Sequence, residues 1–327
     1  MNRTKIITRN QAMQSILMEV EVIRNSDCPV LIIGETGTGK EILADYIHAN
    51  SLRREKRFVK VSLSSLPGSL FESELFGHEK GAYTGAHQAQ QGFFEAANNA
   101  TIYLDDIDDF PIQLQSKLLR VIENKELIHI GSNKPIDNDA RLISSSKAEL
   151  KDLVEKGDFR SDLFYRLSVF RIYIPPLRER KDDIPILLEY FISKSKTENK
   201  ITFDINKINL AHLIDYNWKG NVRELRNFAE KLMLYPIEEI YDNFENIFTN
   251  YIFGNGNNNI EETIQFQEKN KDSFENMVES YEKELITKSL KNSFGNVKLA
   301  SRILIIKHTT LRDKIKKYNI DPTRYKK

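Results

Sequence analysis

The sequence has few features of secreted or membrane proteins. Its 327 residues include one cysteine, Cys28, which excludes an internal disulfide and favours a reducing compartment. No apolar run approaches the length of a membrane span, and the N-terminus lacks the apolar stretch of a signal peptide. The six histidines do not cluster at metal-ligand spacing, so we expect no zinc site. These absences predict a cytoplasmic protein without membrane contact.

The net charge of +1 conceals an uneven distribution. Residues 291–327 contain eleven lysines and arginines but two aspartates, a net charge of +9, which leaves −8 for the other 290 residues. A basic tail on an acidic body predicts a C-terminal module that binds a polyanion. The alternative is a solvated basic helix without a partner.

Short apolar runs alternate with helical periodicity in the first half of the chain. Strands are predicted over five ranges: 29–33, 58–61, 101–104, 140–143 and 170–174. Helices are predicted over three ranges: 13–23, 41–50 and 114–124. This alternation is typical of an α/β fold with a doubly wound, mostly parallel sheet.

Pro175-Pro176 ends the alternating pattern. Apolar residues then recur at helical spacing over 184–193, 206–216 and 222–234, which predicts a small helical subdomain. Gly254-Asn-Gly-Asn-Asn-Asn259 indicates a flexible linker. We therefore divide the chain into four parts: an α/β subdomain (1–176), a helical lid (177–240), a linker (241–272) and a C-terminal helical domain (273–327).

A glycine-rich loop follows the first predicted strand and opens a helix. Backbone N–H groups of such a loop cradle phosphates, and Lys40 is expected to reach the β- and γ-phosphates. Glu41 stands where most P-loops place a Ser or Thr hydroxyl on Mg²⁺. The expected nucleotide-binding residues are Gly34, Glu35, Thr36, Gly37, Thr38, Gly39, Lys40 and Glu41.

Two carboxylates stand at the end of the third predicted strand, in Thr101-Ile-Tyr-Leu-Asp-Asp106. We expect Asp105 to coordinate Mg²⁺ and Asp106 to polarise the attacking water. The alternative is that the pair only caps the following helix.

The hexapeptide Gly81-Ala-Tyr-Thr-Gly-Ala86 has two glycines around an aromatic residue and a threonine. Glycine supplies loop conformations with positive φ at little steric cost. The segment predicts a loop that presents a Tyr-Thr tip as a mobile contact element. The alternative is a surface loop with a buried tyrosine.

Five ordered motifs together closely resemble the AAA+ activators of sigma-54-dependent transcription, the bacterial enhancer-binding proteins. The resemblance covers residues 7–240 and the C-terminal domain. The motifs are Gly34–Glu41, Glu74–Ala86, Phe159–Leu167, Pro175–Arg180 and Trp218–Leu225.

The resemblance implies an AAA+ fold that binds ATP and Mg²⁺ between subunits of a ring, usually a hexamer. Hydrolysis moves the loop 81–86, whose Tyr83 and Thr84 contact sigma-54 and remodel the closed RNA polymerase holoenzyme complex. Tyr83 stands where the family usually has phenylalanine, and it keeps the aromatic face.

Three arginines match catalytic positions of the family. Arg160 and Arg166 match the arginine fingers, which act on the nucleotide of the adjacent subunit. Arg223 matches the sensor arginine of the lid and is expected to bind nucleotide. The alternative for each is a surface salt bridge.

Several positions depart from the family pattern. Asp106 replaces a Glu, and Ser62 replaces an Asn that holds the catalytic carboxylate in check. Lys147 replaces a sensor Asn, and Lys219 replaces the proline before Gly220. We hypothesise normal ATP binding with slowed or differently gated hydrolysis; the alternative is compensated drift.

Residues 296–320 resemble the Fis-type helix-turn-helix. Helices are predicted over 282–292, 297–304 and 309–318, with Asn296 as an N-cap. Ile305 stands where the family prefers Gly, so a distorted turn is expected. The expected apolar set is Ala300, Ile303, Leu304, Leu311 and Ile315. The residues offered to double-stranded DNA are Lys307, His308, Thr309, Thr310 and Arg312 for bases, and Lys314, Lys316 and Lys317 for phosphates. An alternative gives residues such as Arg312 a structural role.

The AAA+ resemblance begins close to Met1. This arrangement is similar to phage-shock-type activators, which lack an N-terminal regulatory domain and are controlled by a protein acting in trans. The alternative is a fragment of a longer regulator. Two other functions stay open: a DNA-binding regulator whose slow or degenerate ATPase serves assembly, and an AAA+ remodeller of another target.

Overall fold

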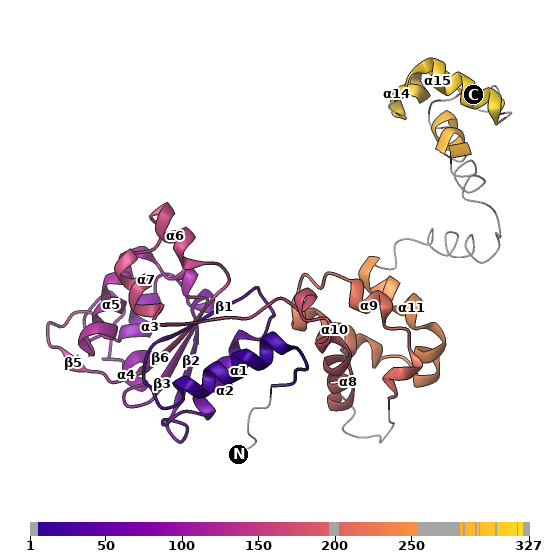
Figure 1. Ribbon diagram of the computed structural model, residues 1–327. Coiled ribbons are helices and arrows are strands. Elements are labelled where there is room, and N and C mark those ends of the chain that lie inside the picture. The colour runs from indigo at the N-terminus through magenta and orange to yellow at the C-terminus, as the bar shows by residue number, and fades with distance from the viewer. Residues whose placement is uncertain are drawn as a thin grey trace. The chain divides into compact units, whose positions relative to one another are not determined.

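The computed structural model describes residues 6–195 and 203–253 and, in the C-terminal part, residues 282–283, 285–291, 293, 295–304, 306–318 and 320–322. The chain divides into two compact units, Met1–Ile252 and Phe253–Lys327, which are described separately (Figure 1). No helix in these described ranges is long and apolar enough to cross a membrane.

A five-stranded parallel sheet forms the centre of the first unit. It contains all five strands that the sequence predicts, and the predicted α/β fold is confirmed. The predicted strand 140–143 continues to Ser146, so this strand reaches the edge of the sheet where the P-loop lies. In spatial order the strands are β2 (Phe58–Ser62), β3 (Thr101–Asp105), β6 (Arg141–Ser146), β1 (Val30–Ile33) and β7 (Phe170–Tyr173).

Helices cover both faces of the sheet (Figure 1). Val30 and Ile32 of β1 share a buried cluster with α1 (Gln11–Ile23) and α2 (Lys40–Ala49). Leu31 and Ile33 point to the other face, because side chains alternate along a strand. All four residues of β1 are buried, which explains why this central strand is a continuous apolar run. The other face is covered by α3 (Phe71–Phe76), α4 (Phe93–Ala96), α5 (Gln115–Asn124), α6 (Leu150–Lys156) and α7 (Ser161–Leu167).

The helical lid departs from the prediction at residues 206–216. The structure has a 3-10 turn at Ile205–Lys207 and a short helix α9 (Ala211–Asp215) in place of one long helix. Asp204 accepts a hydrogen bond from the Asn206 N–H, and Asn209 accepts one from the Ala211 N–H. Asp204 thus caps the 3-10 turn, and Asn209 forms a local turn with Ala211 just before α9, so the two elements start separately. The other two predicted lid helices are present as α8 (Asp183–Ser195) and α10 (Asn221–Leu232).

The predicted start of the linker at residue 241 is wrong. Helix α11 continues the lid over Ile237–Phe253, with non-helical backbone angles at Asn243. Phe244, Ile247 and Phe248 are buried in the same cluster as Trp218. Their aromatic and aliphatic area holds this segment in the lid. The rest of the predicted linker, 254–272, lies outside the described residues.

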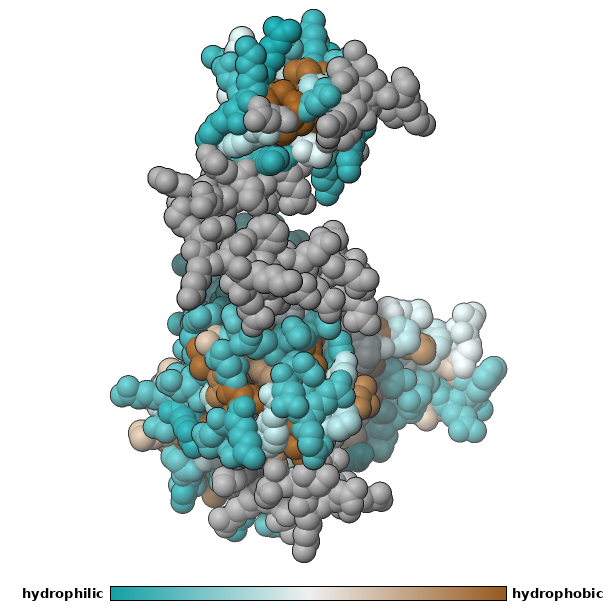
Figure 2. Space-filling view, turned by 90° about the vertical axis from the view of Figure 1, so that its right-hand side faces the viewer, coloured by the Kyte–Doolittle hydropathy of each residue, from teal (hydrophilic) through white to brown (hydrophobic). Residues whose placement is uncertain are grey.

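The C-terminal unit contains α14 (Val297–Ile303), α15 (His308–Lys317) and helical residues at 285–291. Asn296 caps α14, as predicted, because its Oδ1 accepts from the N–H groups of Lys298 and Leu299 at 3.1 and 3.2 Å. Ile303, predicted as internal, is 49% exposed and points outward. Figure 2 shows hydrophilic residues around a small hydrophobic centre in this unit. The fully buried apolar residues are Ile286, Leu290, Ala300, Leu311 and Ile315. The predicted turn residue Ile305 lies outside the described residues.

Candidate nucleotide and DNA sites

The P-loop (Gly34–Lys40) connects β1 to α2. Gly37 and Gly39 both have positive φ angles, +81° and +106°. A Cβ on Gly39 would have no atom within 4 Å, so its backbone faces open space. The Lys40 ammonium is buried and donates to the Gly34 carbonyl at 2.8 Å. A buried cation beside an open loop at a helix N-terminus fits a phosphate.

The P-loop is also fixed to the segment that leads into the lid. Arg178 donates to both carboxylate oxygens of Glu35, at 2.7 and 2.9 Å. Asn221, the first residue of α10, donates to Glu35 Oε2 at 3.1 Å and to the Thr36 carbonyl at 3.0 Å. The Arg178 hydrogen bond outweighs partial burial and lowers the pKa of Glu35 below its usual value. Glu35 therefore supports the loop from outside the phosphate cradle.

Backbone atoms of the P-loop make two more contacts of this kind. Arg180 donates to the Thr38 carbonyl at 2.6 Å, and the Val222 N–H donates to the Gly37 carbonyl at 3.0 Å. Burial lowers the pKa of Arg180 to about 10. The sequence marked Pro175–Arg180 and Trp218–Leu225 as motifs without assigning these roles to their residues.

A cavity of about 620 Å³ opens over the P-loop. It brings together the predicted residues Lys40, Asp105, Asp106 and Arg223. Helix α8 adds Tyr190, which is 38% exposed. No motif in the sequence pointed to this residue. Aromatic faces beside a phosphate cradle suit a nucleobase. The lining residues are Thr36, Gly37, Gly39, Lys40, Glu41, Ile42, Asp105, Asp106, Tyr190, Phe191, Lys194, Val222, Arg223, Arg226 and Glu230. Gly34, Glu35 and Thr38 lie behind this lining and support the loop.

Asp105 ends β3 and is held by two hydroxyl donors. Its Oδ1 accepts from Tyr103 Oη at 2.6 Å and from Ser145 Oγ at 2.5 Å. Burial and the Asp105 charge raise the pKa of the Tyr103 phenol. Ser145 belongs to β6, the strand beside β3, so the sheet order places this hydroxyl next to Asp105.

Asp106 has a left-handed backbone, with φ +60°, which is uncommon for a residue other than glycine. Its Oδ2 lies 3.2 Å from the Lys147 ammonium. Burial and the charge of Asp105 raise the pKa of Asp106, while Lys147 opposes that rise. The sequence identified Lys147 as the replacement of a sensor Asn but did not predict its ion pair with Asp106.

The residues around Asp105 fit one Mg²⁺ ion. Magnesium is held in such sites by one or two carboxylates, with phosphates and water as the other ligands. Within the described ranges, no cluster of three or more His, Cys, Asp or Glu residues is placed to hold a metal alone. Glu41 lines the cavity, but its carboxylate is paired with Lys60 at 2.9 Å. Asp105 is therefore the better placed of the two to contact a metal.

The two predicted finger arginines are exposed and do not line the cavity of their own chain. Arg160 pairs with Asp162 at 2.7 Å, two residues along the chain. Arg166 pairs with Glu123 on α5 at 2.5 Å. Both guanidinium groups are accessible from outside the chain. The structure does not bring them together with Lys40 and Asp106.

The loop Gly81–Ala86 is closed by a backbone hydrogen bond from the Gly81 N–H to the Ala86 carbonyl, at 2.9 Å. Gly81 and Gly85 have φ angles of +82° and +111°. Thr84 is exposed, and Tyr83 is 39% exposed with its ring 5.1 Å from the buried His78 ring. The alternative of a buried tyrosine is therefore wrong. The Tyr-Thr tip faces outward from a short closed loop.

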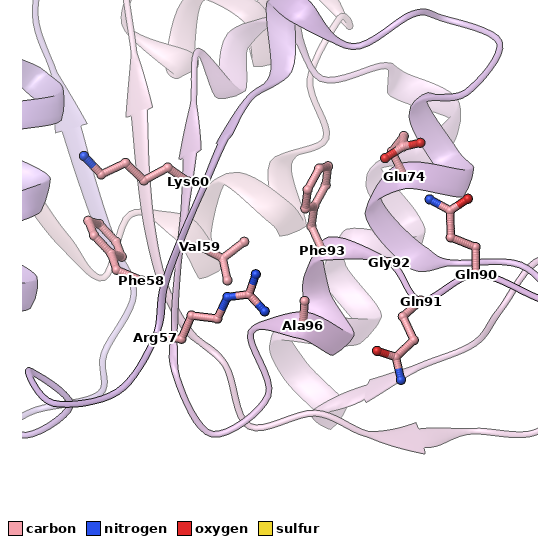
Figure 3. Close-up of a pocket in the computed structure, with 10 residues that line it drawn as sticks. All are labelled: Arg57, Phe58, Val59, Lys60, Glu74, Gln90, Gln91, Gly92, Phe93 and Ala96. Carbon is pink, nitrogen blue, oxygen red and sulfur yellow. The ribbon is translucent and has the colours of Figure 1, made fainter.

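A second cavity, of about 410 Å³, lies beside β2, the edge strand of the sheet (Figure 3). Val59 of β2 and Phe93 and Ala96 of α4 face into it, whereas Lys60 points to the other side of the strand (Figure 3). None of the predicted catalytic or nucleotide-binding residues lines this cavity.

The predicted DNA-binding residues lie on one short surface of the C-terminal unit. Lys307 occupies the N-cap position of α15, and seven of the eight predicted residues are exposed. Lys314 differs from this set, because its ammonium is paired with Glu282 at 2.6 Å. It therefore braces the unit. The seven exposed residues are Lys307, His308, Thr309, Thr310, Arg312, Lys316 and Lys317.

Three families match successive parts of the chain. Residues 6–173 match the Sigma-54 interaction domain, and residues 178–243 match the AAA+ ATPase lid domain. Residues 278–318 match the family described as bacterial regulatory protein, Fis family.

Curated relatives extend the likeness beyond single domains. The chain is 42% identical over 318 residues to a signal-transduction and transcriptional-control protein of Clostridium beijerinckii, covering 96% of this chain and 48% of that protein. It is 47% identical over 233 residues to the formate hydrogenlyase transcriptional activator FhlA of Escherichia coli, covering 70% and 33%. It is 39% identical over 318 residues to the regulatory protein AtoC of Escherichia coli, covering 97% and 68%. The chain thus spans about half or less of the first two relatives.

A solved structure is also similar. NtrX from Brucella abortus in complex with ATP aligns with a TM-score of 0.66 at 28% identity, covering 97% of this chain and 70% of that one. The same protein in complex with ADP gives a TM-score of 0.67 at 27% identity, covering 98% and 70%. The motifs, the AAA+ fold and the matched families agree, and this chain belongs to the family of sigma-54-dependent transcriptional activators.

Proposed function

We propose that this protein hydrolyses ATP to remodel the closed complex of sigma-54 RNA polymerase through the loop Gly81–Ala86. The observation that carries the proposal is that Lys40, Asp105, Asp106 and Arg223 line one cavity together. Residues 1–176 and the lid up to 253 make the motor, and 273–327 bind upstream DNA. A cytoplasmic location follows from these partners.

The proposed chemistry divides roles among this chain's residues. Lys40 binds the β- and γ-phosphates, Asp105 holds the metal, and Asp106 orients the attacking water. Bound Mg²⁺ supplies charge neutralisation to the phosphates. Arg223 contacts the nucleotide from helix α10 of the lid. The first residue of this helix, Asn221, also holds the P-loop.

Arg160 and Arg166 are proposed to act on the nucleotide of a neighbouring subunit in a ring, as arginine fingers do. Their exposure and their absence from the lining of their own chain's cavity support this assignment. A hexamer is the proposed ring. Control by a protein acting in trans is proposed by analogy with phage-shock-type activators.

Promoter opening is the deciding experiment. Purified protein, ATP and the sigma-54 holoenzyme should open a dependent promoter, as measured by permanganate reactivity. Tyr83→Ala and Asp105→Ala should abolish opening, whereas Tyr83→Phe keeps the aromatic face and should retain it. If the wild-type protein opens no promoter under any condition, the activator proposal falls.

A second function is favoured by one observation, the pairing of Asp106 with Lys147. In this alternative the protein is a DNA-binding regulator with a slow or degenerate ATPase, and nucleotide serves mainly for assembly. Phosphate release by the purified protein separates the two, because only the first requires sustained turnover.

DNA binding is proposed to use α15. Arg312→Ala should weaken binding to the specific site by roughly 5- to 150-fold, as for loss of a bidentate base contact worth about 1–3 kcal/mol. Lys316→Ala should weaken binding to all sequences alike and lower the salt slope by about one. Filter binding at several salt concentrations measures both. Equal losses at specific and random sites for Arg312→Ala would contradict its role in base contact.

A further inference from the structure

Lys147 contacts three carboxylates at the end of β3. It is the first residue after β6, the strand next to β3. Its ammonium lies 3.2 Å from Asp106 Oδ2 and 2.9 Å from Asp109 Oδ2. Its backbone N–H donates to Asp108 Oδ1 at 3.2 Å. The backbone contact fixes where the side chain starts, and Asp109 keeps the ammonium within reach of Asp106.

Asp106 is restrained from this side. In the described part of the chain, Lys147 is the side chain that pairs with its carboxylate. Ser62, at the end of β2, has its hydroxyl 3.3 Å from the Ser64 hydroxyl. The Asp106 backbone is held in the left-handed region, where its N–H donates to Ser145 Oγ at 3.1 Å. Backbone and side chain are thus both constrained in the structure.

In the Lys147–Asp106 ion pair, another anion can replace the Asp106 carboxylate. The Lys147 side chain is 36% exposed and that of Asp106 16%, so a competing anion has access to the ammonium. Lysine carries a compact charge on a flexible stem and can change partner with little backbone movement. A terminal phosphate is a stronger competitor than one carboxylate, since it carries more charge and more acceptor oxygens.

Lys147 does not line the nucleotide cavity, but its charge acts on Lys40 of the phosphate cradle. Burial lowers the pKa of Lys40, and repulsion by Lys147 contributes to that fall, whereas Asp106 opposes it. Lys40 and Lys147 therefore repel one another, and both are attracted to Asp106. An anion between them would be attracted by both.

We propose that Lys147 is a positioning residue that restrains Asp106 and releases it when a nucleoside triphosphate offers its terminal phosphate to the same ammonium. This inference rests on the proposed ATPase and concerns its gating. A diphosphate lacks the competing group, so Lys147 stays on Asp106. No bond is made or broken in this exchange.

Nucleotide binding without turnover tests the proposal. Displacement of fluorescent ADP from the purified full chain, with Mg²⁺ present, gives affinities for ADP and for a non-hydrolysable ATP analogue. Lys147→Met should weaken the triphosphate by about tenfold, the lower end of what a charged hydrogen bond is worth. ADP affinity should stay within about twofold. Lys147→Arg should keep the preference, and Lys151→Met is the control for loss of an exposed lysine on α6.

The competition itself is measured by a double-mutant cycle. Asp106→Asn removes the carboxylate charge that competes for Lys147, so it should raise the affinity for the triphosphate. This gain should be about fivefold larger in the wild-type background than in Lys147→Met, because residues in contact are coupled. The proposal is overturned if the gain is equal in both backgrounds, or if Lys147→Met weakens ADP and triphosphate alike. Failure of the wild-type protein to bind either nucleotide would instead overturn the proposed ATPase itself. Thermal unfolding of each variant shows that it is folded.

Discussion

The two sides of the nucleotide cavity are held by different kinds of contact. On the phosphate side, backbone carbonyls of Thr36, Gly37 and Thr38 accept hydrogen bonds from the lid and from Arg180. On the opposite side, Asp105 and Asp106 are held by the hydroxyl of Ser145 and the ammonium of Lys147. In the first set the acceptors are backbone carbonyls, which cannot leave without moving the loop, whereas in the second both partners are side chains.

This difference indicates where control resides. Several hydrogen bonds to backbone carbonyls would have to break together before the P-loop changed shape, so the binding side is rigid. At the end of β3, by contrast, breaking the ion pair with Lys147 is enough to release the Asp106 carboxylate. Nucleotide binding and hydrolysis should therefore be separable by mutation.

Asp106→Asn should separate them most strongly. If Asp106 orients the attacking water, its loss should lower the turnover number by about 10²–10⁴, the usual contribution of a general base. ADP affinity should change by less than about twofold, because the P-loop contacts are untouched. Phosphate release and ADP displacement measure the two effects. A comparable fall in ADP affinity would show that the two sides are not independent.

The sequence predicted the sheet well for a simple reason. Strand β1 is buried on both faces, so Val30–Ile33 is a continuous apolar run that is recognisable without any neighbour. The predicted helix 206–216 was wrong because the side chains of Asp204 and Asn209 bond to backbone N–H groups two residues on and divide the segment, which apolar spacing does not record. The end of α11 was missed because its aromatic residues are buried only against lid residues that are distant in the sequence.

The site was predictable where a motif carried it. Lys40, Asp105 and Asp106 were named from local pattern, and the structure places them on one cavity. The pair of Glu35 with Arg178 joins residues 143 positions apart, so no local pattern contains it. The pair of Asp106 with Lys147 depends on β6 lying beside β3, which is a property of sheet order.

Two glycines of the P-loop test the rigidity of the binding side. Gly39→Ala should cost about 1 kcal/mol in free energy of unfolding, from positive φ alone. Gly37→Ala should cost about 1–3 kcal/mol more. At Gly37 the added Cβ would lie 2.3 Å from the Gly220 carbonyl oxygen, whereas at Gly39 it meets nothing.

Trp218 is the only tryptophan and is buried in the lid core, so its fluorescence during urea unfolding reports on the lid directly. A further measurement of ADP affinity shows whether displacing the lid also weakens nucleotide binding. Equal losses in free energy of unfolding for the two alanine variants would mean that the lid moves away from the added Cβ at Gly37 without loss of stability. The binding side would then be less rigid than its hydrogen bonds indicate.

The smallest effect is expected from the exposed part of the binding side, the pair of Glu35 with Arg178. Because the Arg178 hydrogen bond lowers the pKa of Glu35, its stabilisation is present above the usual glutamate pKa of about 4.3. It is lost as the pH falls through the lower folded value. Wild-type protein should be more stable than Glu35→Gln at pH 7, and the gap should close as the pH falls below about 4.3.

Urea unfolding followed at Trp218 over this pH range measures the gap. Glu179→Gln is the matched control, since its carboxylate lies 3.9 Å from the same guanidinium and is 55% exposed. That substitution should leave the pH dependence nearly unchanged. Water screens the Glu35–Arg178 pair, whose side chains are 40% and 38% exposed, so the effect should be smaller than that of Gly37→Ala. A gap that stays constant with pH would show that the backbone contacts alone hold the P-loop.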